Sequence, residues 1–173
     1  MKFAHTTALL AGLALTGCAT APPNREIGIQ TPYDAAQAVL LLQPGTNSIK
    51  GSALLRQQGG GVVTCAGRRV FLIPTTGYAR ERVGKLYGGN ATKMYLPAQR
   101  SANFTPNPPD YQKNVKEATC DAQGFFTFER VGDGSFYVNT SVNWTVNNVE
   151  QGGFLIELVT IKNSELQTVV LTR

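Results

Sequence analysis

The sequence contains very little histidine: His5 is the only one among 173 residues. Histidine is the usual general base of nucleophilic triads and a common ligand of zinc and iron, so those sites have almost no support here. Charged residues are also scarce, at 16% of the chain against 42% apolar residues. This balance excludes a highly charged disordered chain and a coiled coil. Together with 18 glycines and 9 prolines, it favours one turn-rich β domain.

The longest apolar run, residues 8–15, is too short to cross a bilayer, which takes about 20 residues. It follows the charged Met1-Lys2, and this layout is typical of a secretory signal peptide over residues 1–17. The run ends in Leu15-Thr16-Gly17-Cys18, which resembles the lipobox of bacterial lipoproteins. The resemblance implies cleavage before Cys18, acylation of its sulfur and amine, and a stable palmitate-type membrane anchor.

Two alternatives to a lipobox stay open: a signal peptide cleaved near Ala19 or Ala21, and a buried apolar helix of a cytosolic protein. In enterobacterial lipoproteins an Asp after the lipidated cysteine causes retention in the inner membrane. This chain has Ala19 there, so the resemblance implies the periplasmic face of the outer membrane. Cleavage would also remove His5, and the mature chain would then have no histidine.

Cys65 and Cys120 remain once Cys18 is assigned to lipid. An exported protein meets an oxidising compartment, where such a pair usually forms a disulfide. This bridge would close a loop of about 56 residues, which the chain-entropy relation converts to roughly 4 kcal/mol of stabilisation. A reactive thiol pair is the alternative, but the two residues lack Cys-x-x-Cys spacing.

The chain after Cys18 divides into a tether, a helix and a series of strands. Residues 18–30 carry a proline pair and no apolar periodicity, so they are predicted to be a lipidated tether. The domain is predicted to span residues 31–173 and to begin with a helix over 31–43, with Thr31 as N-cap and Pro32 in the first turn. Strands separated by turns are then predicted at 49–57, 62–65, 69–74, 125–131, 135–144, 154–162 and 166–171.

Residues 75–117 are predicted to be a long insertion, with a short basic helix over 78–87 and a proline-rich loop over 103–109. A long insertion in a compact sandwich is more often functional than incidental, although it can also cover an exposed sheet edge. Its basic and aromatic side chains are a candidate surface for acidic headgroups, anionic glycan or a protein partner. An ordinary solvated surface is the alternative. The candidate residues are Tyr78, Arg80, Arg82, Lys85, Lys93 and Arg100.

Motifs for catalysis or cofactors find little support. The run Gln57-Gln58-Gly59-Gly60-Gly61 is followed by no Gly-Lys-Ser/Thr, so it indicates a hairpin turn. Asp121, Glu129 and Asp133 could form a glycosidase acid pair, but the two aspartates lie in glycine-containing turns. We therefore expect no catalytic residues, metal, cofactor or nucleic-acid partner. Trp144 could stack on a sugar, although the alternation around it favours the core.

The stretch from Thr119 to Phe128, followed by Gly132-Asp133-Gly134 and residues 135–138, resembles the carboxypeptidase regulatory-like domains. Residues 50–53 and 66–73 resemble the first strands of the same pattern. The resemblance implies one antiparallel β-sandwich, related in architecture to transthyretin, that binds or scaffolds and has no catalytic residues of its own. The insertion and the cysteine pair depart from the family pattern.

The sequence thus predicts a mainly β, outer-membrane lipoprotein with one N-terminal helix and a long insertion. Its expected role is a structural or protein/glycan interaction module of the cell envelope, without catalysis. A lipoprotein subunit of a secretion or envelope-spanning apparatus is one alternative. A carboxylate-dependent carbohydrate-active enzyme is the other.

Overall fold

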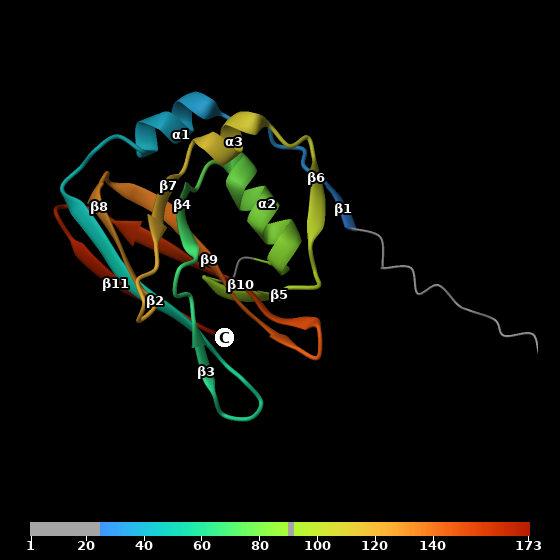
Figure 1. The fold of residues 1–173 in the computed structure, drawn as a ribbon. Coiled ribbons are helices and arrows are strands. Elements are labelled where there is room, and N and C mark those ends of the chain that lie inside the picture. The colour runs from blue at the N-terminus through green and yellow to red at the C-terminus, as the bar shows by residue number, and fades with distance from the viewer. Residues whose placement is uncertain (1–24, 90–91) are drawn as a thin grey trace, which may run out of the picture.

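The computed structural model describes residues 25–89 and 92–173, so the signal peptide, Cys18 and the first part of the predicted tether lie outside it (Figure 1). Within the described residues the chain is mainly β, with eleven strands and three helices. The strands form two larger sheets and one small pair.

Five antiparallel strands form the larger sheet. Their order is β5 (Lys93–Pro97), β10 (Val149–Ile161), β9 (Gly134–Val146), β4 (Arg69–Pro74) and β7 (Lys116–Thr119). The second sheet has β2 (Asn47–Arg56) at its centre. β11 (Leu166–Leu171) runs parallel to β2 on one side, and β3 (Val62–Thr64) and β8 (Phe125–Val131) pair with it antiparallel.

The main core lies between the two sheets and draws side chains from both. On β9, Phe136, Val138, Thr140 and Val142 are all buried, which confirms the predicted alternation of that strand. The opposite face of β9 is not simply solvated, because Tyr137 on that face is also buried. The larger sheet is therefore covered on both sides.

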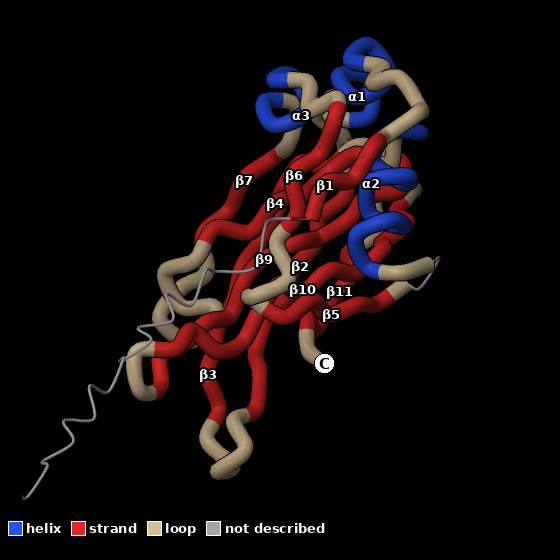
Figure 2. The backbone as a smooth tube through the Cα atoms, turned by 90° about the vertical axis from the view of Figure 1, so that its right-hand side faces the viewer, coloured by secondary structure: helices blue, strands red, loops and turns tan. Residues whose placement is uncertain are grey.

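The outer cover of the larger sheet comes from the insertion and the N-terminal segment. α2 (Gly77–Tyr87) lies over this sheet (Figure 1). Its Val83 packs against Met94, Tyr137 and Ile156 of the sheet. Beside α2, β1 (Arg25–Gly28) pairs in parallel with β6 (Ala102–Thr105). α1 (Ala35–Leu41) and α3 (Pro109–Lys113) lie together at one end of the sheets, and the β2–β3 hairpin lies at the other (Figure 2).

All seven predicted strands are present, but the prediction that the sheets are wholly antiparallel is wrong for β11. The buried Asn47 at the start of β2 explains the difference. Its side-chain carbonyl accepts a hydrogen bond from Glu165 N, 2.8 Å away, just before β11 begins. Since β2 and β11 both start at this point, they run in the same direction.

Three further predictions about the N-terminal half need correction. Residues 25–28 are a strand, and Ile27 and Ile29 are buried, so this part of the predicted tether belongs to the folded domain. The first helix begins at Ala35, because Asp34 Oδ1 accepts the capping hydrogen bond from Gln37 N at 2.9 Å. The insertion contains β5, β6 and α3 besides the predicted helix, which α2 confirms.

Candidate functional site

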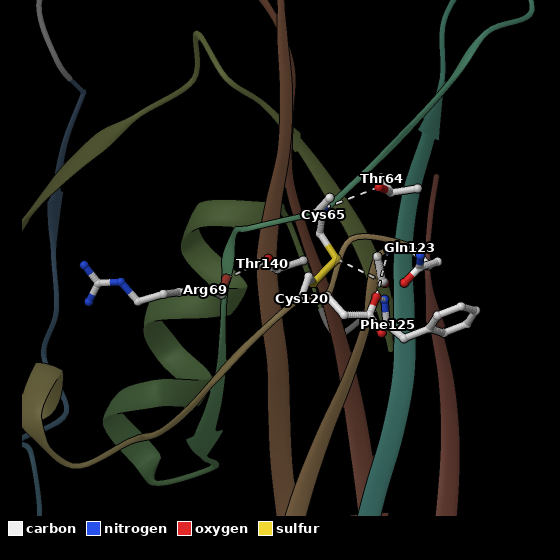
Figure 3. The surroundings of a disulfide bond; sticks show 10 residues. Thr64, Cys65, Arg69, Cys120, Gln123, Phe125 and Thr140 are labelled. Atoms are coloured by element: carbon white, nitrogen blue, oxygen red, sulfur yellow. Dashed lines mark hydrogen bonds between the residues drawn. A yellow bond between two sulfur atoms is a disulfide. The ribbon is translucent and has the colours of Figure 1, made fainter.

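The cysteines form the predicted disulfide (Figure 3). Cys65 directly follows β3 of the smaller sheet, and Cys120 directly follows β7 at the edge of the larger one. Both residues are buried, with 0% and 3% exposure. The bond therefore joins the two sheets within the core, where it is shielded from external thiols.

Of the three candidate carboxylates, Glu129 is an exposed residue of β8, and the two aspartates lie far from each other. Asp121 Oδ1 accepts hydrogen bonds from Gln123 N and Phe125 N, both at 2.9 Å, as expected for a turn residue. Asp133 Oδ1 accepts from Asn47 Nδ2 at 2.8 Å. The two aspartates flank opposite ends of the seven-residue strand β8, roughly 20 Å apart at ~3.3 Å per residue. Glycosidase pairs lie about 5 to 9.5 Å apart, so these two carboxylates cannot serve as one.

The six residues of the predicted partner surface do not form one patch. Tyr78 is completely buried, and its hydroxyl donates to Pro106 O at 2.7 Å, so its placement on the surface is wrong. Lys93 pairs with Glu157 at 3.2 Å. Arg82 lies over the Phe104 ring, 3.6 Å from its centroid, whereas Arg80 and Arg100 are exposed. The remaining residue, Lys85, belongs to a separate network.

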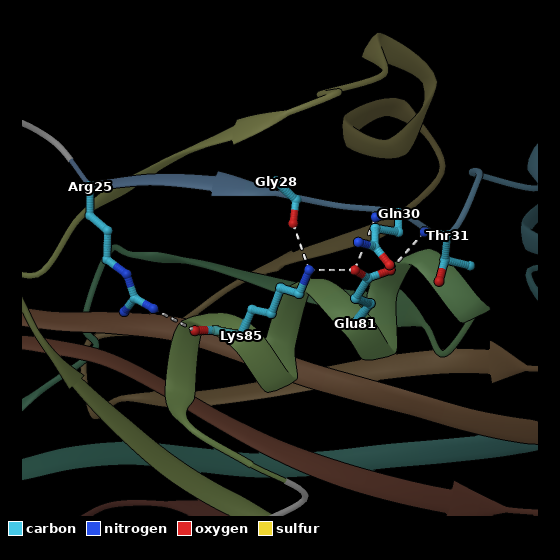
Figure 4. A network of polar contacts seen from close by, with 6 residues as sticks. All are labelled: Arg25, Gly28, Gln30, Thr31, Glu81 and Lys85. Atoms are coloured by element: carbon cyan, nitrogen blue, oxygen red, sulfur yellow. Dashed lines mark hydrogen bonds and ion pairs between the residues drawn. The ribbon is translucent and has the colours of Figure 1, made fainter.

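Glu81 and Lys85 of α2 hold the N-terminal segment against the insertion (Figure 4). The Glu81 carboxylate accepts hydrogen bonds from Gln30 N at 3.0 Å and Thr31 N at 2.7 Å, and lies 2.7 Å from Lys85 Nζ. Lys85 Nζ also donates to Gly28 O at 2.7 Å. The Lys85 ammonium and these backbone donors hold the pKa of Glu81 far below its usual range. This network has a structural role, because it ties residues 28–31 to α2.

The most site-like arrangement surrounds Trp144, near the end of β9 and beside the β2–β3 hairpin. The indole is half-buried: one part packs against the main core, and another part lines two adjoining hollows of about 540 and 170 Å³. The first hollow lies between residues 57–59 of the β2–β3 hairpin and residues 146–151 of the β9–β10 hairpin. Trp144 therefore packs against the core, as expected, but only with one side of its ring.

Gly152 makes room for the indole. Its φ is +88°, and a Cβ atom at this position would come within 2.9 Å of the Trp144 ring and overlap the Val142 carbonyl oxygen. The Gly152 carbonyl accepts a hydrogen bond from the Tyr95 hydroxyl at 2.8 Å, which positions a second aromatic ring beside the smaller hollow. A glycine within a long strand often marks such a close approach, and Gly152-Gly153 was the signal in the sequence that could have revealed this site.

The hollows around Trp144 offer the groups that a sugar needs. An indole face can stack on the apolar face of a sugar ring, and glutamine amides can both donate to and accept from hydroxyl groups. Gln57, Gln58 and Gln151 line the hollows, and among the described residues none forms a hydrogen bond with their side-chain amides. Arg173 lies 5.5 Å from the Tyr95 ring centroid and adds a positive charge.

Within the described residues, no cluster of three or more histidine, cysteine, aspartate or glutamate side chains could hold a metal ion. In the same part of the chain, no helix is long and apolar enough to cross a membrane.

Comparison with known proteins gives a structural similarity that bears on this site. No known protein family and no curated protein sequence matches the chain. The fold is similar to the crystal structure of a "putative carbohydrate binding protein" from Pseudomonas aeruginosa, with a TM-score of 0.67 and 26% sequence identity. The similarity covers 83% of this chain and 99% of that one.

Proposed function

We propose that this chain is a non-catalytic glycan-binding module of the bacterial cell envelope, and that it binds a sugar chain at Trp144. The observation that carries this proposal is the partly exposed indole set between amide side chains from two hairpins. Aromatic rings combined with a few well-placed polar groups are typical of ligand sites, and no aspartate or glutamate of the described residues lines either hollow to act as an acid or base.

The structural similarity supports the same ligand class. The protein from Pseudomonas aeruginosa is described as a "putative carbohydrate binding protein", and nearly its whole length aligns with this chain. The two packed sheets and the core between them also favour a β-sandwich of the carboxypeptidase regulatory-like type, in which β1, α2 and β6 are additions.

Membrane anchoring through Cys18 is the second part of the proposal. Labelled palmitate should enter the wild-type chain during growth, and the label should disappear in Cys18→Ala. The acyl chains would hold the protein to the outer membrane at about 0.8 kcal/mol per buried methylene. A soluble, unlabelled wild-type protein would overturn the anchor without affecting the glycan site.

Sugar binding at Trp144 can be followed directly, because this is the only tryptophan in the chain. Titration with soluble peptidoglycan fragments and with neutral glucan oligosaccharides should shift the tryptophan emission and reach saturation. In calorimetry, Trp144→Ala should weaken binding by about 30-fold, since a central aromatic anchor contributes about 2 kcal/mol.

Phe125→Ala is the matched control, because Phe125 is an aromatic residue with 57% exposure that lies outside both hollows. It should bind the same oligosaccharides as tightly as the wild type. If no oligosaccharide produced a saturable change in the tryptophan emission, the proposed glycan site would be wrong. Release of shorter sugars during the titration would favour the carboxylate-dependent enzyme instead.

A further inference from the structure

A second candidate site lies in a groove between α2, β6 and the larger sheet. It consists of two adjoining hollows of about 260 and 350 Å³, which share the lining residues Leu86, Tyr87, Leu96, Ser101 and Ala102. We refer to the 260 Å³ hollow as the inner hollow and to the other as the outer hollow. Trp144 lines neither of them, so this groove is a separate hollow from the proposed glycan site, although Tyr95 lines both the outer hollow and the smaller hollow beside Trp144.

The inner hollow is predominantly apolar. Val83, Leu96 and Ile156 are buried residues that line it, and the Phe104 and Tyr111 rings add aromatic surface. Its volume equals that of roughly nine water molecules at ~30 Å³ each. Few polar groups reach it, so a sugar ring with a hydroxyl on almost every carbon would lose hydrogen bonds there.

Positive charge lies along the groove. Arg82 lines the inner hollow, and Arg25 and Arg100 line the outer one, whereas no aspartate or glutamate of residues 25–89 and 92–173 lines either. Among the described residues, none of these three guanidinium groups takes part in an ion pair. The side-chain hydrogen bond from Arg25 to Lys85 O is long, at 3.4 Å, so its charge remains available to a ligand.

Arg82 is fixed in place before any ligand arrives. One of its terminal nitrogens donates to Asn107 Oδ1 at 2.8 Å and to the Tyr78 hydroxyl at 3.2 Å, while the group stacks on Phe104. Tyr87 lines both hollows and accepts from Asn139 Nδ2 at 3.3 Å. Burial raises the pKa of Tyr87, so its phenol stays protonated and can donate to an acidic group at neutral pH.

From this combination we infer that the groove binds a single-chain anionic amphiphile, with its alkyl chain in the inner hollow and its carboxylate or phosphate at Arg25 and Arg100. Apolar contact accounts for the tail and charge complementarity for the head. A neutral sugar would use neither the apolar surface nor the positive charge of the groove. An acidic sugar would use only the positive charge.

The test is calorimetric titration of the full chain with alkyl carboxylates of increasing length, from butanoate to dodecanoate, and with dodecyl phosphate. Affinity should rise by up to about four-fold per added methylene until the inner hollow is full, since each buried methylene contributes ~0.8 kcal/mol. Tridecanoate, added to the series, has the same twelve-carbon alkyl chain as dodecyl phosphate, so comparing these two identifies which acidic group the arginines prefer. Neutral dodecyl maltoside should bind at least ten-fold more weakly than either. Affinity that does not change with chain length, or equal binding of the neutral amphiphile, would overturn the inference.

Two double variants with the same net charge separate local recognition from general attraction. Arg25→Ala with Arg100→Ala should weaken dodecanoate binding by ten- to a hundred-fold, because both head contacts are lost. Arg68→Ala with Arg80→Ala removes two exposed arginines that line neither hollow and should leave binding unchanged. Equal losses in the two variants would show attraction to net charge alone and would overturn the site. Since Trp144 is intact in both, sugar titration of the same proteins distinguishes a failure here from a failure of the glycan site.

Discussion

Replacing Cys65 and Cys120 together with alanine should lower the free energy of unfolding by about 4 kcal/mol, as the chain-entropy relation gives for a loop of this length. The cross-link limits the unfolded chain by joining segments 55 residues apart in the sequence. It also connects β3 of the smaller sheet to β7 of the larger one, so both sheets gain conformational freedom when the disulfide is removed. For a domain of this size the midpoint of thermal unfolding should fall by roughly 8–16 °C.

Dithiothreitol provides the matched control for the double variant. Reduction of the unfolding wild-type chain should bring its midpoint close to that of the variant, and the same reagent should leave the variant unchanged. Both cysteines are buried in the folded state, so reduction requires unfolding and should be slow at low temperature. The stabilising role would be contradicted if the midpoint of the double variant lay within 2 °C of that of the oxidised wild type. That difference corresponds to a change of only about half a kcal/mol in the free energy of unfolding.

The strands could be predicted from the sequence because their signals are local. Residues 135–144 alternate with a period of two, and the structure buries the expected face of β9. The turn at Asp121 could also be predicted from the sequence, because an aspartate shortly before a glycine commonly accepts backbone hydrogen bonds. The cysteine pair followed from counting alone, because only one pairing remained after Cys18 was set aside.

The features that were missed depend on partners far away in the chain. β1 exists because residues 25–28 pair with residues 102–105, and no local pattern announces a four-residue strand of this kind. Thr31 had the composition of a helix cap, but Asp34 caps α1 instead. The backbone N–H of Thr31 is bound by Glu81, fifty residues later, so the chain before Asp34 is placed by a contact that neighbouring residues do not reveal.

The candidate sites were only partly predictable for the same reason. Trp144 was identified as a residue that could stack on sugar, yet the hollow beside it forms only when two hairpins, 57–59 and 146–151, meet at one end of the sheets. Arg82 and Arg100 were identified as basic residues of the insertion, whereas Arg25 was assigned to a tether. The groove that joins them depends on the β1–β6 pairing, so it could not be derived from composition.

Tyr78→Ala should destabilise the protein by about 3–5 kcal/mol, the range for deleting a large buried aromatic ring. Tyr78 is the centre of an aromatic cluster, with ring centroids 5.7 Å from Tyr33 and 5.0 Å from Tyr111. These three residues come from the N-terminal segment, α2 and α3, so the cluster holds together three parts of the chain that are distant in sequence. Chemical denaturation measures the loss, and hydrogen exchange should speed up first at Ile27 and Ile29, which pack in the same cluster.

Tyr78→Phe separates the ring from its hydroxyl group. It keeps the stacking but removes the donor to Pro106 O and the acceptor for Arg82, so a smaller loss of about 1–3 kcal/mol is expected. Sugar binding at Trp144 should stay the same in this variant, because Tyr78 lines neither of the hollows there. If alanine and phenylalanine at position 78 destabilised the protein equally, the ring would contribute nothing, and the cluster could not be what joins the N-terminal segment, α2 and α3.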